Sequence, residues 1–126
     1  MTRPYAPATD YKPDWGPLYR SRGEADVADA LSRLGINYVY EPRLELSGFD
    51  PSHVEYARPD FMLSINRPVV IEYAGMLDQP DYHARHQAKA DLYAANGIDL
   101  IEIKPDDLLD PDWERSLLEQ IIQSCM

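Results

Sequence analysis

The sequence predicts an α/β fold in which helices flank a mixed sheet of four strands. Strand-length apolar runs fill the middle of the chain, between stretches whose apolar residues recur at helical spacing. A turn-forming segment at 64–68 joins two of these runs, which favours an antiparallel hairpin. A helical stretch then precedes the last apolar run, and a helical crossover is typical of parallel strands. With 126 residues the chain is long enough for one domain with a core of modest size.

Residues 1–19 are predicted to form an arm, and residues 20–126 a single domain. The arm carries prolines between aromatic residues, and prolines at that density prevent a regular helix or strand. We expect the arm to pack its aromatic rings on the domain or on a partner. The alternative is a loosely ordered terminus.

A helix is expected to open the domain. Ser21 can cap its N-terminus, and Glu24 follows three residues later as the partner in a capping box. Apolar residues then recur at helical spacing up to Gly35, which can end the helix as a C-cap.

The remaining elements follow from apolar patterning and turn residues. Strands are expected at 36–46, 56–63 and 68–73, separated by turns at 47–51 and 64–68. A helix is expected at 81–95 and a short strand at 98–103, with Asn96-Gly97 between them. A turn or short helix begins at Pro105, and a last helix is expected over 112–123. The predicted order is α-β-β-β-α-β-α.

Composition limits the classes of function. Cys125 is the only cysteine, so one chain cannot form a disulfide framework or a thiolate zinc site. Together with the lack of a signal peptide, this predicts a cytoplasmic protein, and no apolar run approaches the length of a membrane span. The net charge of −10 argues against binding nucleic acid by charge alone. A metal-dependent nuclease remains compatible with it, because bound cations offset acidic residues.

Two carboxylates frame the predicted hairpin. Asp60 directly precedes one apolar run, and Glu72 lies near the end of the next. The hairpin would place both acids side by side at one edge of the sheet. Carboxylates forced together repel each other unless a hard cation lies between them. The sequence therefore predicts a Mg²⁺ or Mn²⁺ site, and with it phosphodiester hydrolysis.

In this element order and these motifs, the chain resembles the PD-(D/E)XK nuclease superfamily. That superfamily includes restriction endonucleases, Holliday-junction resolvases and the very-short-patch-repair endonuclease. Its core is α-β-β-β-α-β, with a glutamate on the first helix, an aspartate on the second core strand and an acid-x-lysine motif on the third. Glu24, Pro59-Asp60 and Glu72 match the acidic positions, and the resemblance spans roughly 20–108. Residues 71–76, Ile-Glu-Tyr-Ala-Gly-Met, are similar to the signature of a small branch in which a Tyr/Arg/Lys helix follows.

The resemblance implies a restriction-endonuclease-like core with a metal site. Asp60, Glu72 and the main-chain carbonyl of Tyr73 are expected to bind one Mg²⁺ or Mn²⁺. Glu24 is expected to complete the outer shell of that ion or to help hold a second one.

Ala74 departs from the family pattern, because the motif lysine would occupy this position. Some family members supply the basic group from the following helix, where Lys89 is the natural candidate. Lys89 would orient the attacking water or stabilise the transition state. It shares one helical face with Tyr82, Arg85 and Tyr93. The residues expected to contact phosphates of the substrate are Arg22, Tyr82 and Arg85.

These implications predict a DNA endonuclease of recombination, repair, or phage and mobile-element DNA processing. A Holliday-junction resolvase is one form of it, which would cut duplex or branched DNA as a homodimer, alone or beside a helicase or recombination partner. The alternative is a catalytically inactive nuclease-fold module that serves as a DNA-binding or assembly subunit of a larger complex. Ala74 and the acidic balance favour this alternative. For single residues a structural reading also remains open, with Glu24 as a capping acid and Lys89 as a surface lysine.

Overall fold

The computed structural model describes residues 19–48, 54–75 and 80–126, and among them it contains the predicted mixed four-stranded sheet. The strands lie in the order β1 (Tyr38–Tyr40), β4 (Phe61–Leu63), β5 (Val69–Tyr73) and β6 (Asp99–Ile103). Neighbouring strands are antiparallel from β1 to β5, whereas β5 and β6 are parallel. All of the predicted arm except its last residue, Tyr19, falls outside the described residues.

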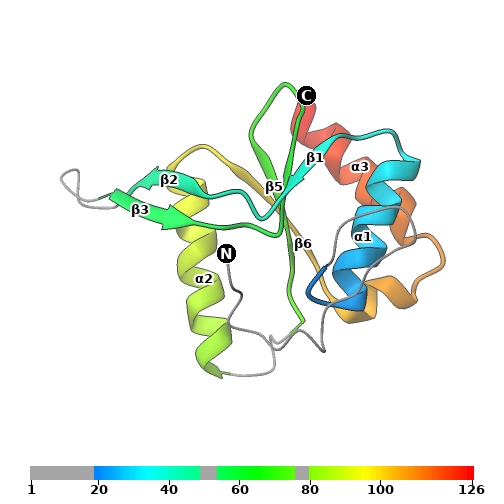
Figure 1. The fold of residues 1–126 in the computed structure, drawn as a ribbon, viewed down its shortest axis with the longest axis horizontal. Coiled ribbons are helices and arrows are strands. Elements are labelled where there is room, and N and C mark those ends of the chain that lie inside the picture. The colour runs from blue at the N-terminus through cyan, green and yellow to red at the C-terminus, as the bar shows by residue number, and fades with distance from the viewer. Residues whose placement is uncertain (1–18, 49–53, 76–79) are drawn as a thin grey trace.

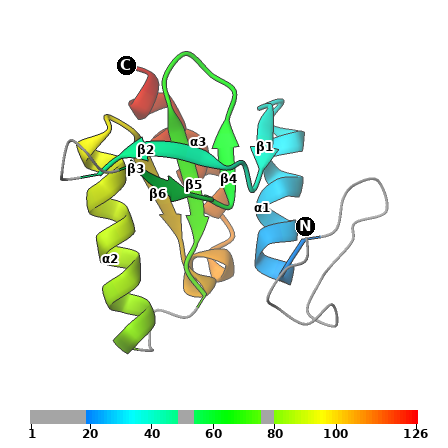
Figure 2. The ribbon, with the colours of Figure 1, turned by 60° about the vertical axis from the view of Figure 1, so that its left-hand side comes forward.

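Helices cover both faces of this sheet (Figures 1 and 2). Helices α1 (Arg22–Arg33) and α3 (Trp113–Cys125) lie on one face, and α2 (Pro80–Ala95) lies on the other. The larger apolar cluster joins the sheet to α1 and α3 through residues such as Leu31, Ile71 and Leu117. A smaller cluster joins the opposite face to α2 through Val70 and Tyr93. Because side chains alternate along a strand, Glu72 of β5 faces α2.

The strands predicted at 36–46 and 56–63 are each two strands, so those predictions are wrong. Their outer halves, β2 (Leu44–Ser47) and β3 (Val54–Ala57), form a separate antiparallel hairpin beside α2. The first run breaks at Glu41, whose φ of 50° lies in the left-handed region, and at the following Pro42. The second run breaks at Pro59, which lacks the N–H that a central strand would donate.

The other predicted elements are confirmed with small shifts at their ends. Ser21 caps α1 by accepting a hydrogen bond from the Glu24 N–H at 3.1 Å. The turn at 64–68 joins β4 to β5 as an antiparallel hairpin, and α2 is the crossover to the parallel strand β6. The segment after β6 forms the short 3-10 helix η2 (Pro105–Leu109). Among the residues that the structure describes, no helix combines the length and the apolar content that a membrane span needs.

Candidate active site

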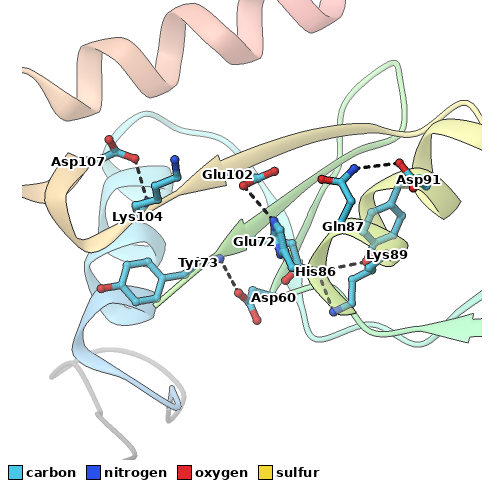
Figure 3. A network of polar contacts seen from close by, with 11 residues as sticks. Asp60, Glu72, Tyr73, His86, Gln87, Lys89, Asp91, Glu102, Lys104 and Asp107 are labelled. Carbon is cyan, nitrogen blue, oxygen red and sulfur yellow. Dashed lines mark hydrogen bonds and ion pairs between the residues drawn. The ribbon is translucent and has the colours of Figure 1, made fainter. Parts of the chain in front are cut away.

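Asp60 and Glu72 meet at one end of the β4–β5 hairpin. Phe61 pairs with Ile71, and continuing this antiparallel register by one position places Asp60 opposite Glu72. Asp60 lies in the bend just before β4, where its Oδ2 accepts a hydrogen bond from the Tyr73 N–H at 2.6 Å. Figure 3 shows this bond, with Glu72 and Lys89 nearby on the same side of β5. The predicted juxtaposition of the two acids is therefore present.

Glu72 is a buried acid held by two donors from α2. Only 7% of its surface is exposed. Its Oε1 lies 3.2 Å from Lys89 Nζ and accepts a second hydrogen bond from the Tyr93 hydroxyl at 3.3 Å. Lys89 itself is partly exposed, so its ammonium lies between the buried acid and solvent. Lys89, on the helix that follows β5, thus reaches the Glu72 carboxylate. Ala74, two residues after Glu72, offers no charged partner.

The electrostatics of Asp60 reflect this crowding. Burial raises the pKa of Asp60 well above its usual range, and the negative charges of Glu72 and Glu24 raise it further. The hydrogen bond from the Tyr73 N–H and the positive charge of Lys89 act in the opposite direction. Because like charges act on Asp60 from both other acids, the three predicted carboxylates belong to one electrostatic unit.

Glu24 joins this unit from the first helix. It lies in the first turn of α1, is 7% exposed, and accepts a hydrogen bond from the Tyr40 hydroxyl on β1. Burial raises the pKa of Glu24, although the bond from Tyr40 counteracts part of that rise. The Glu24 carboxylate therefore turns toward the sheet instead of lying on the helix surface.

Tyr73 connects β5 to the start of α1. Its aromatic ring lies so close to Gly23 that a Cβ there would come within 2.1 Å of Tyr73 Cζ. Its backbone N–H donates to the Asp60 carboxylate. Tyr73 thus contacts the start of α1 through its ring and the Asp60 carboxylate through its backbone.

Arg20 and Glu41 form a second charged pair near Glu24, and no sequence motif predicted it. Arg20 Nε lies 2.8 Å from Glu41 Oε2, and both side chains are largely buried. The Glu41 N–H donates to the Asp60 carbonyl oxygen at 2.9 Å. This hydrogen bond joins the break in the first run, at Glu41, to the break in the second run, beside Pro59. The negative charge of Glu41 raises the pKa of Glu24, and the positive charge of Arg20 lowers it.

The predicted substrate-binding residues are more scattered. Arg22 is exposed at the start of α1 and makes a surface ion pair with Asp26 at 3.6 Å. Arg85 is exposed on α2. Tyr82 lies within α2, but its side chain is outside what the structure describes. Of the predicted stripe on α2, Lys89 and Tyr93 lie on the inner face together with His86, whereas Arg85 faces solvent.

The carboxylates can be assessed as ligands for the predicted Mg²⁺ or Mn²⁺. Within the described ranges, no three or more His, Cys, Asp or Glu side chains gather closely enough to hold a metal ion. Asp60 and Glu72 still fit as a pair of ligands, because each carboxylate is oriented by hydrogen bonds through one oxygen and keeps its other oxygen for a cation. The Tyr73 carbonyl accepts from the Gly75 N–H at 3.2 Å and has a second lone pair.

Three contacts of the site were not predicted from the sequence. They are Tyr40 beside Glu24, Tyr93 beside Glu72, and the pair His86–Glu102 next to Lys89. Tyr93 and His86 are recognisable in retrospect, since they lie one helical turn from Lys89 in either direction. Tyr40 carried no such signal, because its contact with α1 depends on the tertiary fold.

Comparisons with protein-family models, with curated proteins and with solved structures give no match for this chain. The functional assignment of this chain therefore depends on the geometry of the site.

Proposed function

We propose that this chain is a Mg²⁺- or Mn²⁺-dependent DNA endonuclease with a PD-(D/E)XK-type core, in which α2 supplies the lysine of the site. In this proposal the core is α1, β1, β4, β5, α2 and β6, and the β2–β3 hairpin is an insertion. The order of these elements, without the hairpin, is the α-β-β-β-α-β order of that superfamily.

The contact between Lys89 and Glu72 is the observation that carries the proposal. A buried acid at the end of a central strand is costly unless it has a defined partner. Glu72 has such a partner in Lys89 Nζ, 3.2 Å away, even though Ala74 offers no charge. The lysine comes from the helix that follows the strand, which is where the resemblance suggested that it could come from.

The acids in this proposal hold the cation. Asp60 and Glu72, together with the Tyr73 carbonyl, would bind it, and Glu24 would lie in its outer shell or help to hold a second ion. A bound Mg²⁺ lowers the pKa of its water and neutralises charge on the scissile phosphate. Tyr73 and Tyr93 orient the two carboxylates through hydrogen bonds that are already formed in the structure.

Lys89 acts on the reacting atoms. In phosphodiester hydrolysis a water oxygen forms a bond to phosphorus, and the bond to the leaving sugar oxygen breaks. The Lys89 ammonium is partly exposed beside Glu72, so it can hydrogen-bond to the water or to a phosphate oxygen as negative charge develops. Arg22, Arg85 and Tyr82 would contact flanking phosphates.

A cleavage assay tests the proposal. Purified protein is incubated with a four-way junction, a duplex and a single strand of DNA, each with Mg²⁺, Mn²⁺ or EDTA. We expect cleavage that requires the metal, and a loss of about a hundredfold or more in Asp60→Asn and Glu72→Gln. The matched control is Glu119→Gln, which removes one exposed acid from α3 and should cleave at the wild-type rate. Equal rates in all four proteins would overturn the site assignment.

A second candidate is a catalytically inactive module that uses the same fold for assembly or for DNA binding beside a partner. Two observations favour it: the net charge of −10 and the alanine at position 74. Calorimetric titration with Mn²⁺ separates the two functions. Binding that is lost in Asp60→Asn favours the nuclease, whereas a folded wild-type protein that binds no Mn²⁺ favours the module.

The proposed substrate also bears on assembly. An enzyme that cuts two strands of a junction symmetrically works as a C2 dimer. Sedimentation of the protein with and without a four-way junction measures this. A dimer in the complex supports a junction resolvase, and a monomer favours a nuclease that cuts one strand at a time.

A further inference from the structure

Glu72 has an acidic neighbour on the adjacent strand. Glu102 of β6 is its register partner in the parallel β5–β6 pair. Residues paired in this way lie on adjacent strands about 5 Å apart and point to the same face of the sheet. Helix α2 therefore lies over two carboxylates, of which the proposed nuclease mechanism uses only one.

Helix α2 places one side-chain nitrogen beside each of these carboxylates. His86 Nε2 lies 2.9 Å from Glu102 Oε2, and Lys89 Nζ lies 3.2 Å from Glu72 Oε1. His86 and Lys89 are three residues apart, so they lie on the same side of the helix. Only 10% of the His86 side chain is exposed. Figure 3 shows the two contacts next to each other between α2 and the sheet.

The two contacts are chemically unequal. The His86 ring is rigid and packed, and it can donate from Nε2 whether it is neutral or protonated. Lysine has a long flexible stem with a compact charge, and it can reach either of two acids that lie about 5 Å apart. Without His86, the Glu102 carboxylate would compete with Glu72 for Lys89, because a negative charge about 5 Å away also attracts the ammonium.

We propose that His86 and Glu102 form a positioning pair for the nuclease site. In this pair His86 occupies the Glu102 carboxylate, and Lys89 therefore stays in contact with Glu72. This inference rests on the proposed function, in which Lys89 acts on the reacting phosphate. In this mechanism His86 binds neither the metal nor the substrate, and it acts through Lys89.

A reversal experiment tests the pair. His86→Leu removes the imidazole that pairs with Glu102, and we expect kcat for DNA cleavage to fall about tenfold, a size typical of coupling between residues in contact, with KM unchanged. Adding Glu102→Gln removes the competing charge, so the double variant should recover to within about threefold of wild type. Gln87→Leu, which disrupts an exposed contact with Asp91 on the same helix, is the matched control and should leave kcat unchanged. A double variant as slow as His86→Leu would overturn the inference.

A second measurement does not depend on activity. The NMR signal of the Lys89 side chain is followed in the metal-free protein. In wild type, Glu72→Gln should shift this signal and Glu102→Gln should leave it nearly unchanged. In the His86→Leu background, Glu102→Gln should shift it instead. If Glu72→Gln has the same effect in both backgrounds, the positioning role is wrong even where cleavage is observed. If the NMR pattern is as expected and no DNA is cleaved, the proposed function fails and the pairing stands.

Discussion

The Tyr73 N–H donates a 2.6 Å hydrogen bond to the Asp60 carboxylate, and this bond joins the two motifs that the sequence places on either side of a turn. A backbone N–H that binds a carboxylate favours its ionised form. Here that effect is the smaller one, because burial and the charges of Glu72 and Glu24 together raise the pKa of Asp60. The fold thus holds Asp60 in a position that is unfavourable for its charge and suitable for binding a cation.

The first prediction concerns the stability of the metal-free protein against pH. A carboxyl whose pKa is raised by folding stabilises the fold fully only below its unfolded pKa, and this stabilisation is lost as pH rises through the folded pKa. Asp60→Asn keeps an oxygen that can accept from the Tyr73 N–H and removes the charge. We expect Asp60→Asn to be more stable than wild type by about 1–2 kcal/mol at pH 8 in EDTA, and much closer to it at pH 4.

Urea unfolding at pH 4, 6 and 8 measures this difference. Glu119→Gln serves as the control, since Glu119 is exposed on α3 and its removal should give a difference that does not grow with pH. Saturating Mn²⁺ should reduce the difference in the free energy of unfolding between Asp60→Asn and wild type, because only wild type keeps both carboxylate ligands. An advantage for Asp60→Asn that is constant across this pH range would contradict the raised pKa.

The sequence was sufficient to predict the hairpin that brings the acids together. Turn residues at 64–68 lie between two apolar runs, so local chemistry determines both the antiparallel pairing and its register. It was not sufficient at Glu41, where a positive φ ends β1 early. Glutamate is not a residue that marks such a conformation. The visible signals of the two breaks were Pro42 and Pro59, which the strand predictions did not take into account.

The same contrast applies to the site. Glu24, Asp60, Glu72 and Lys89 could be proposed as site residues from the sequence because each lies in a motif with defined spacing. Their partners are less visible, because a tyrosine hydroxyl that binds a buried acid looks in the sequence like any other core aromatic. Tyr40 and Tyr93 are examples, since burial raises the pKa of both hydroxyls and each donates to one of the acids.

The second prediction tests whether Lys89 replaces the missing motif lysine. Lys89→Ala should reduce DNA cleavage about a hundredfold or more, whereas Arg115→Ala, which removes an exposed charge from α3, should not.

Ala74 is buried and lies two residues after Glu72, so its side chain points to the same face of the sheet. A lysine at 74 could therefore use the space vacated by the Lys89 stem. We expect Ala74→Lys with Lys89→Ala to regain about tenfold over Lys89→Ala alone. A double variant that is folded and no faster than Lys89→Ala would show that the two positions are not equivalent.

The third prediction separates the two roles of the helix start. Ser21→Ala removes the side chain that caps α1, so it should lower the free energy of unfolding by about 1 kcal/mol and leave the cleavage rate of the folded enzyme unchanged. Glu24→Gln keeps an acceptor for the Tyr40 hydroxyl and loses the charge. We expect it to cost little stability and to reduce cleavage about tenfold to a hundredfold. Urea titration and initial cleavage rates measure the two effects. If Glu24→Gln cleaves DNA at the wild-type rate, Glu24 has only a structural role, as a capping acid.

The fourth prediction uses the contact between Gly23 and Tyr73. A methyl group at position 23 would lie 2.1 Å from Tyr73 Cζ, so in Gly23→Ala the ring must move. Because the clash involves the outer end of a half-buried side chain, the ring can swing toward solvent. Alanine is also the better helix former by about 1 kcal/mol, which offsets the lost packing. We therefore expect the free energy of unfolding to change by less than about 1 kcal/mol.

Cleavage should fall much more than stability, by about tenfold or more, because the Tyr73 backbone holds the Asp60 carboxylate in place. Tyr73→Ala supplies the matched background, since without the ring there is nothing for the new methyl group to displace. In that background Gly23→Ala should have no further effect on the rate. A loss of the same size in both backgrounds would mean that Gly23 acts through α1 itself, and the link from α1 through Tyr73 to Asp60 would be wrong.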